Sequence, residues 1–307
     1  MFKHKEDRIP TLLIVLLTVL DFYLYFTVES VWVLVAYWLL MIIPKGTIGA
    51  WNHHHQHLAM FKSKVLNRSI EQVYALHTGQ TTNLWLLHHV LGHHYNYLDQ
   101  NIDQSRWKRN SGAKMGPLEY TLDVTLTAYY RAYQVGKSKP MHARHLRAFV
   151  LYSSITALIV LGLVIYQPLQ ALFLFVLPMI GSLMFTAWVT YDHHAGLDTD
   201  DHFHASYNIP NPLFNKLTGN LGYHTAHHYR QGVHWSKLPA LHEKIKHNIP
   251  EELYVKSTFD LISPAKTVTQ RNAKAGANAV SKAKEAAAVT ATATTAAILS
   301  SKEKSQA

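Results

Sequence analysis

The 307-residue sequence contains no cysteine. This absence excludes disulfides, thiolate-bound zinc and any iron–sulfur cluster ligated by the chain itself. The HExxH pattern of zinc proteases is also missing, which argues against metal-dependent hydrolysis. Acidic residues are few, 19 against 29 Lys and Arg, so the formal net charge is +10. Such a balance fits either nucleic acid or an anionic membrane surface.

Long apolar runs decide between these two partners. They lie at about 9–28, 31–51, 148–166 and 169–191, and each approaches the ~20 residues that cross a bilayer as a helix. Four such runs in two close pairs argue against buried helices of a soluble protein. No A-x-A-like cleavage site follows the first run, so it is not interpreted as a signal peptide. We therefore predict an all-α integral membrane protein with four transmembrane helices in two hairpins, and no nucleic-acid partner.

The distribution of positive charge predicts the orientation. The links at 29–30 and 167–168 carry no Lys or Arg, whereas 1–8, 61–148 and the segment after 191 carry three, twelve and thirteen. The positive-inside rule then places both termini in the cytoplasm. Residues 52–147 and 192–262 are predicted to form a histidine-rich helical cap there, close to anionic lipid. A membrane domain over 1–264 precedes a tail at 265–307, which has no aromatic residue and is predicted to be disordered.

One carboxylate, Asp21, lies inside the first apolar run. Intramembrane acids are often functional. No charged partner is apparent in the facing span, so Asp21 is interpreted as a bundle-facing or outer-leaflet residue.

The 22 histidines are not evenly distributed. They gather in WNHHHQH (51–57), LHHVLGHHYNY (87–97), YDHHAG (191–196) and HTAHH (224–228). Spacings of three and four place side chains on one helical face, which favours such a face for His53 with His57, for His89 with His93, and for all three histidines of the last cluster. By contrast, His77, His234, His242 and His247 are interpreted as structural or solvent-facing.

Imidazole is the usual nitrogen ligand for zinc, copper and iron. One metal takes about four to six ligands, so nine histidines from four clusters fit two metals better than one. The predicted ligands are His53, His57, His89, His93, His94, His194, His224, His227 and His228. No further catalytic side chain is predicted beyond them.

Three of these clusters resemble the histidine boxes of the membrane fatty acid desaturase–hydroxylase superfamily. They read His53-HHQ-His57, His89-VLG-His93-His94 and His224-TA-His227-His228. The order of spans and boxes is similar as well, over residues 9 to about 255. The stretch HTAHHYRQGVHWSKLP looks most like bacterial fatty acid desaturases. The HxxxHH spacing of the second box is closer to alkane hydroxylases, and a third relative is the membrane decarboxylase that makes terminal alkenes.

The resemblance implies two irons as cofactors, O2 as cosubstrate and a long acyl chain as substrate. It implies oxygen-dependent desaturation in a bacterial inner membrane. A hydroxylase or a 1-alkene-forming decarboxylase remains an alternative, and a non-redox membrane metal-binding protein is a rival of another class. The chain has no cysteine for a ferredoxin module and no HPGG haem motif, so a separate redox partner of the ferredoxin/reductase type is expected.

Side chains near the boxes are candidates for orienting the ligands, because a ligating imidazole usually donates its other N–H to a carboxylate or carbonyl. The predicted set is Asp99, Asp192, Asp198, Thr190, His55 and His193. Thr190 stands where some desaturases of the family have an asparagine that completes the site through water.

Overall fold

The computed structural model describes residues 1–261, and the tail predicted at 265–307 lies outside this range. Within residues 1–261 the chain is helical, and extended residues pair only in three isolated bridges. The α-helices are α1 Arg8–Thr27, α2 Val31–His57, α3 Lys64–Thr78, α4 Pro117–Ser138, α5 Ala143–Tyr166, α6 Pro168–Ala171, α7 Leu177–His194, α8 Pro212–Thr218, α9 His224–Tyr229 and α10 Leu238–Ile245. Two π-helical segments are η2 Leu86–His94 and η4 Leu172–Val176. Short 3₁₀ turns are η1 Lys5–Asp7, η3 Pro140–His142, η5 Trp235–Lys237, η6 Lys246–Asn248, η7 Glu251–Leu253 and η8 Thr258–Leu261.

Four helical segments are long and apolar enough to cross a membrane. They are Lys5–Thr27, Val31–His57, Pro140–Tyr166 and Pro168–His194, so the predicted all-α membrane fold is confirmed. Only 11 to 33 % of their most apolar windows is buried. Such outward-facing apolar surface matches a lipid environment. Both α2 and α7 continue past the predicted ends of their spans, and the extra turns carry histidines.

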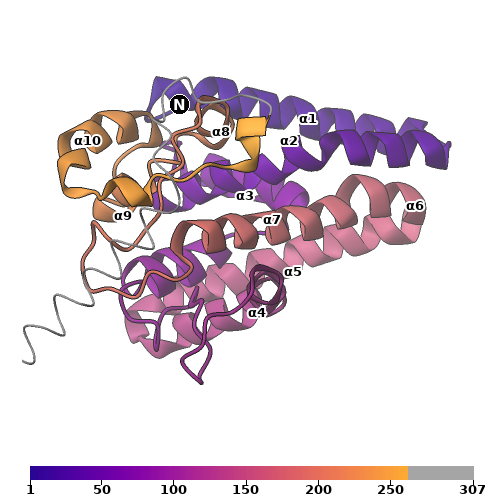
Figure 1. Cartoon of the computed structure of the whole chain (residues 1–307). Helices are drawn as coiled ribbons and strands as arrows, with labels where there is room; N and C mark the ends of the chain where they lie inside the picture. The colour runs from indigo at the N-terminus through magenta and orange to yellow at the C-terminus, as the bar shows by residue number, and fades with distance from the viewer. Residues whose placement is uncertain (262–307) are drawn as a thin grey trace, which may run out of the picture. The chain divides into compact units, whose positions relative to one another are not determined.

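The spanning helices come in two consecutive pairs (Figure 1). Helices α1 and α2 lie side by side, separated by residues 28–30, and Gln167 alone separates α5 from α6. The short helices α8, α9 and α10 gather at the end of the bundle where α2 and α7 finish. This arrangement brings the third and fourth histidine clusters to the first.

Helix α3 occupies the space among the long helices. It begins at Ser63, whose Oγ accepts a hydrogen bond from Leu66 N, and ends at Gly79, where φ is +66°. Glycine suits this left-handed position because it has no Cβ. The helix packs against α1, α2, α5 and α7. Helix α3 thus lies within the segment 52–147 that is predicted to belong to the cytoplasmic cap, and its apolar face is buried against the spanning helices.

Asp21 faces the bundle, as expected, but it has a charged partner in the adjacent span. Its Oδ2 lies 2.8 Å from Lys45 Nζ, and Tyr37 donates a hydrogen bond of 2.7 Å to its Oδ1. Lys45 also donates to the carbonyl oxygen of Leu174 in the π-helical segment η4. Both charged side chains are almost fully buried. The pair ties α1 to α2, and Lys45 connects it to the second pair of helices.

The C-terminal end of the π-helix η2 is closely packed against the loop that follows it. The Gly92 carbonyl accepts hydrogen bonds from Gln104 N at 3.2 Å and from Asn96 Nδ2 at 3.0 Å. A Cβ on Gly92 would lie 2.5 Å from Gln104 Cγ, so only glycine lets the following loop approach this closely. These contacts hold the following loop against the C-terminal end of η2. Single π-turns of this kind are common at functional sites.

Candidate metal centre

Nine histidines from four elements converge at the end of the bundle. The last turns of α2 and α7 supply His53, His57 and His194, η2 supplies His89, His93 and His94, and α9 supplies His224, His227 and His228. Eight of them are buried and His57 is partly exposed. The structure thus brings together all nine of the predicted ligands.

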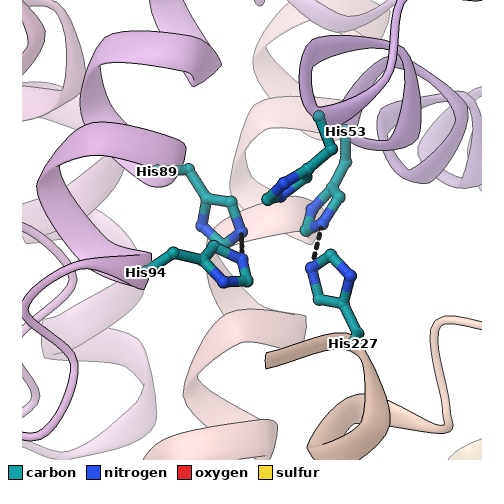
Figure 2. A group of neighbouring side chains, drawn as sticks. His53, His89, His94 and His227 are labelled. Atoms are coloured by element: carbon teal, nitrogen blue, oxygen red, sulfur yellow. Dashed lines mark hydrogen bonds between the residues drawn. The ribbon is translucent and has the colours of Figure 1, made fainter. Parts of the chain in front are cut away.

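The first set, called group A, consists of five histidines whose ligand atoms lie within 4.8 Å of one another: His53, His57, His89, His94 and His227. The Nε2 atoms of His53 and His227 are 2.8 Å apart, and those of His89 and His94 are 3.0 Å apart. Figure 2 shows the rings of His53 from α2, His89 and His94 from η2, and His227 from α9 turned toward one another.

The second set, called group B, is centred on His194. Its Nε2 lies 3.2 Å from His93 Nε2, 3.0 Å from His224 Nε2 and 3.1 Å from His228 Nε2. The groups adjoin, because the rings of His94 and His228 stack with centroids 4.0 Å apart. The chain therefore forms two neighbouring imidazole cages, one with five members and one with four.

The prediction from spacing that His89 and His93 lie on one helical face is wrong, because both lie in η2. In an α-helix His89 and His93 would point the same way, but the π-helix pairs His89 with His94 in group A and sends His93 to group B. In α9, His224 and His228 enter group B while His227 enters group A. Spacing alone cannot reveal this division, since it depends on the wide turn and on the position of α9 between the two groups.

The nitrogen arrangement fits metal ions better than hydrogen bonds. An imidazole nitrogen carries one proton or one lone pair, so His194 Nε2 can make only one hydrogen bond to its three Nε2 neighbours. Metal–nitrogen bonds of about 2.1 Å, as for zinc, give octahedral ligand–ligand edges of about 3.0 Å. The closest Nε2 pairs are 2.8 to 3.2 Å apart. The donor set therefore fits two metal ions.

The electrostatics keep these rings neutral. Burial, reinforced by neighbouring imidazoles, lowers the pKa of His89, His94, His224, His227 and His228 well below the usual range. A neutral imidazole has a free lone pair to donate to a metal. No Asp or Glu is part of either group, so ligation by these residues would be all nitrogen.

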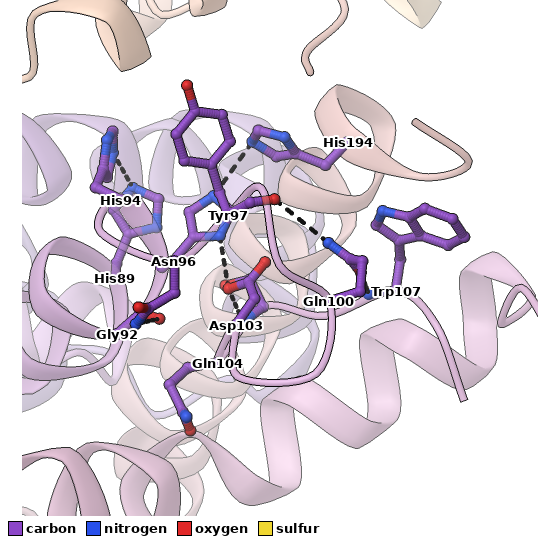
Figure 3. Close-up of polar contacts among 12 residues, drawn as sticks. His89, Gly92, His94, Asn96, Tyr97, Gln100, Asp103, Gln104, Trp107 and His194 are labelled. Carbon is purple, nitrogen blue, oxygen red and sulfur yellow. Dashed lines mark hydrogen bonds and ion pairs between the residues drawn. The ribbon is translucent and has the colours of Figure 1, made fainter. Parts of the chain in front are cut away.

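Two ligand candidates have clear orienting partners. His93 Nδ1 lies 2.8 Å from Asp103 Oδ1, and His194 Nδ1 lies 2.9 Å from the Ala205 carbonyl oxygen. Both contacts leave Nε2 to face the group, as a ligating tautomer requires. Figure 3 shows Asp103 with other side chains of the loop that follows η2, and His194 of α7 beside them. Asp103 was missed by the sequence reasoning, which looked closer to the boxes.

The three acids predicted to orient ligands contact none of the nine histidines in the described part of the chain. Asp99 binds the backbone N–H of Asn101 at 2.9 Å, Asp198 pairs with Lys108 at 2.5 Å, and Asp192 is exposed. The predicted role is wrong for Asp99 and Asp198, because each turns toward its own loop.

The other predicted neighbours lie closer to the groups. His193 stacks on His224 at 3.9 Å and places Nδ1 2.9 Å from the Tyr207 carbonyl oxygen. His55 pairs with Glu71 at 3.3 Å and so faces α3. Thr190 donates its hydroxyl hydrogen to the Thr186 carbonyl oxygen, four residues earlier in the same helix. Of the three, His193 is the one in ring contact with a predicted ligand.

A cavity of about 30 Å³ leads from the middle of α2 and α7 to the histidines of both groups. It begins beside Gly46 and Gly49, and its other lining residues are Ala50, His53, His89, Phe185, Thr186, Val189, Thr190, His193, Thr218, Leu221 and His224. Its lining is largely apolar and ends at members of both groups, and its volume is room for about two water molecules.

Four apolar helices that carry two adjoining histidine groups define a membrane protein built to bind metal. Comparison with known families agrees with this class, since the family model described as fatty acid desaturase matches residues 30–259. No curated protein and no solved structure matched the chain. The match covers most of the chain, which therefore belongs to the fatty acid desaturase family and is a membrane di-iron oxidoreductase.

Proposed function

We propose that this protein is an oxygen-dependent desaturase that introduces a double bond into a long acyl chain. The observation that carries the proposal is the division of nine buried histidines into two adjoining cages, together with family membership. Group A and group B would each hold one iron. Bound iron would supply O2 activation and removal of hydrogen from an unactivated methylene, which no side chain achieves alone.

The chain's own residues position the substrate and keep water out. An acyl chain would reach the histidines between α2 and α7, where Phe185 and Thr186 pack closely against Gly46 and Gly49. It would have to displace these two side chains, because the cavity has room for only about two water molecules. Asp103 and the Ala205 carbonyl hold the rings of His93 and His194 in the ligating orientation. Holding a methylene pair at a fixed place beside both groups is the condition for losing hydrogen from adjacent carbons.

Electrons would come from a separate ferredoxin/reductase-type partner. The membrane would be the bacterial inner membrane, with both termini and the histidine groups at its cytoplasmic face, in agreement with the charge distribution.

Gas chromatography–mass spectrometry of lipids and volatiles from cells expressing the chain tests the reaction. New internal unsaturation that requires O2 supports the proposal, whereas hydroxy acids or 1-alkenes would reassign the same centre to the alternative chemistries. Metal analysis of the purified protein should find two irons per chain. His227→Ala and His224→Ala remove one member of group A and of group B, and each should abolish product. His247→Ala, at an exposed position, is the matched control. Zinc alone, with activity unchanged in His227→Ala, would favour the non-redox rival.

A further inference from the structure

A second cavity, of about 10 Å³, lies on the other side of group A. This is room for roughly one water molecule. Its lining joins two members of group A, His57 and His227, to the start of the chain and to the segment after α9. The remaining lining residues are Asp7, Trp51, His54, His55, Leu58, Met60, Gln231, Val233, His234 and Trp235.

One polar atom of this lining has no role in the site described above. Gln231 Oε1 is fully buried and has no hydrogen-bond partner among the described residues 1–261. A buried carbonyl oxygen left unpaired costs about 1–3 kcal/mol, so it is normally satisfied by protein or by water. In a cavity of this size, a water molecule that donates to Gln231 Oε1 satisfies it beside group A.

The far end of the cavity holds a buried carboxylate–imidazole pair. His234 Nε2 lies 3.0 Å from Asp7 Oδ1, and Trp235 Nε1 donates to the same oxygen at 2.8 Å. Both Asp7 and His234 are 5 % exposed. The ring of His234 stacks at 4.0 Å on that of His4, which is partly exposed. His234 was interpreted from sequence as structural or solvent-facing, and the structure places it inside the protein.

These contacts form a polar path from the surface to group A. His4 is reached from outside, His234 and Asp7 follow, and the cavity with Gln231 comes last. Glu6 lies near His4 and His234, and Lys237 from η5 faces His4. His54 from α2 faces both members of the pair, and Tyr74 from α3 faces Asp7. The pair connects residues 227 positions apart.

The reaction under the proposed function requires protons at the buried centre, and the present inference rests on that proposed function. Desaturation of one CH2–CH2 unit by O2 with two donor electrons and two protons yields CH=CH and two water molecules. The substrate supplies two hydrogens and solvent must supply two protons. Hydroxylation by O2, with one water as coproduct, consumes the same two electrons and two protons. Any of the candidate reactions therefore needs protons at a buried centre.

We propose that Asp7 and His234 deliver protons to group A through the water bound at Gln231. A proton taken up at His234 sits in the hydrogen bond between His234 Nε2 and Asp7 Oδ1. It then passes to the cavity water, which lies against His57 and His227. Asp7 and His234 touch neither substrate nor metal, so they are positioning and relay residues.

Proton uptake can be measured directly without knowing the acyl substrate. The iron-loaded protein is reduced with dithionite, freed of reductant and mixed with O2 in weak buffer containing a pH-indicator dye. Two Fe(II) and O2 take up two protons and give two Fe(III) and H2O2. Asp7→Asn keeps an oxygen that accepts from Trp235 but carries no proton, and it should slow proton uptake about tenfold or more. Exogenous formate should restore the rate in Asp7→Gly, where the space of the carboxylate is vacated.

Controls separate a relay from a structural clamp. Glu252→Gln, at an exposed position outside the path, should leave proton uptake unchanged. Iron content and melting temperature of Asp7→Asn should match those of the parent. An experimental density map of the parent should show an ordered water at Gln231 Oε1, and Gln231→Leu should remove that water and slow uptake. Uptake at the parental rate in Asp7→Asn, or slowing in Asp7→Gly that formate does not relieve, overturns the relay. If the unmodified protein takes up no protons at all on mixing with O2, the proposed function itself fails.

Discussion

The contact between Asp103 and His93 makes a sharp prediction about metal retention. Both side chains are buried, at 3 and 0 % exposure, and their hydrogen bond of 2.8 Å fixes which nitrogen of His93 faces group B. Loss of such a partner typically lowers metal affinity by about 10- to 100-fold, or about 1.4 to 2.7 kcal/mol. Asp103→Ala should therefore weaken the group B metal by this factor. Asp103→Asn should fall between, because its amide oxygen still accepts a hydrogen bond but without charge.

Asp99 provides a closely matched control. Each aspartate accepts a hydrogen bond from the backbone N–H two residues later, Asn101 for Asp99 and Ser105 for Asp103. Asp99→Ala thus removes the same type of loop contact without touching a histidine.

The assay is iron content per chain, measured by mass spectrometry after equilibration with increasing chelator. Asp103→Ala should release one iron at about 10- to 100-fold lower free chelator than the parent and keep the other. Release of both irons together at the parental chelator concentration would refute the reasoning. An equal shift in Asp99→Ala would also refute it, because the effect would then come from the loop and not from His93.

Three further predictions concern the bundle and η2. Lys45→Met leaves the buried Asp21 without its cation and should destabilise the protein by about 3–5 kcal/mol, measured by thermal unfolding in detergent, while adding Asp21→Leu should restore most of the loss. Gly49→Val places a Cβ 2.4 Å from Thr186 Oγ1, so product should fall while both irons remain, and Gly162→Ala, with open space around it, should change neither. Deletion of Val90 should convert the π-turn of η2 to an α-turn, and since the histidines on either side would then change register, metal analysis should show less than two irons per chain.

Much of the fold followed from the sequence because hydropathy and length are local properties. The four spans, their pairing and the nine converging histidines could all be predicted from residue type and order. Helix α3 could not, because its length and polarity resemble those of a surface helix. Only the packed structure shows that its Ile70 and Tyr74 face the interior of the bundle.

The sequence predicted which histidines form the site, but not how they divide into two groups or which side chains orient them. Spacing rules assume 3.6 residues per turn, and the π-helix breaks this assumption between His89 and His94. Asp103 lies in a loop, ten residues after His93 in the sequence. Sequence periodicity cannot predict that this loop folds back to place Asp103 beside His93. The charge partner of Asp21 was visible in principle, since Lys45 is the one Lys or Arg within the second apolar run.

At two places in the chain, neighbouring residues belong to different histidine groups. In η2, His93 belongs to group B and His94 to group A, and in α9, His227 belongs to group A and His228 to group B. Neighbouring Cα atoms stay 3.80 Å apart whatever the fold does around them. A change in bilayer thickness changes the tilt of the helices that span it. Helices α2 and α7 are such spanning helices, and their ends carry histidines of the two groups. The distance between the two groups is nevertheless fixed by peptide bonds in elements outside the spans. The spacing of the dinuclear centre should therefore be insensitive to the thickness of the membrane that surrounds it.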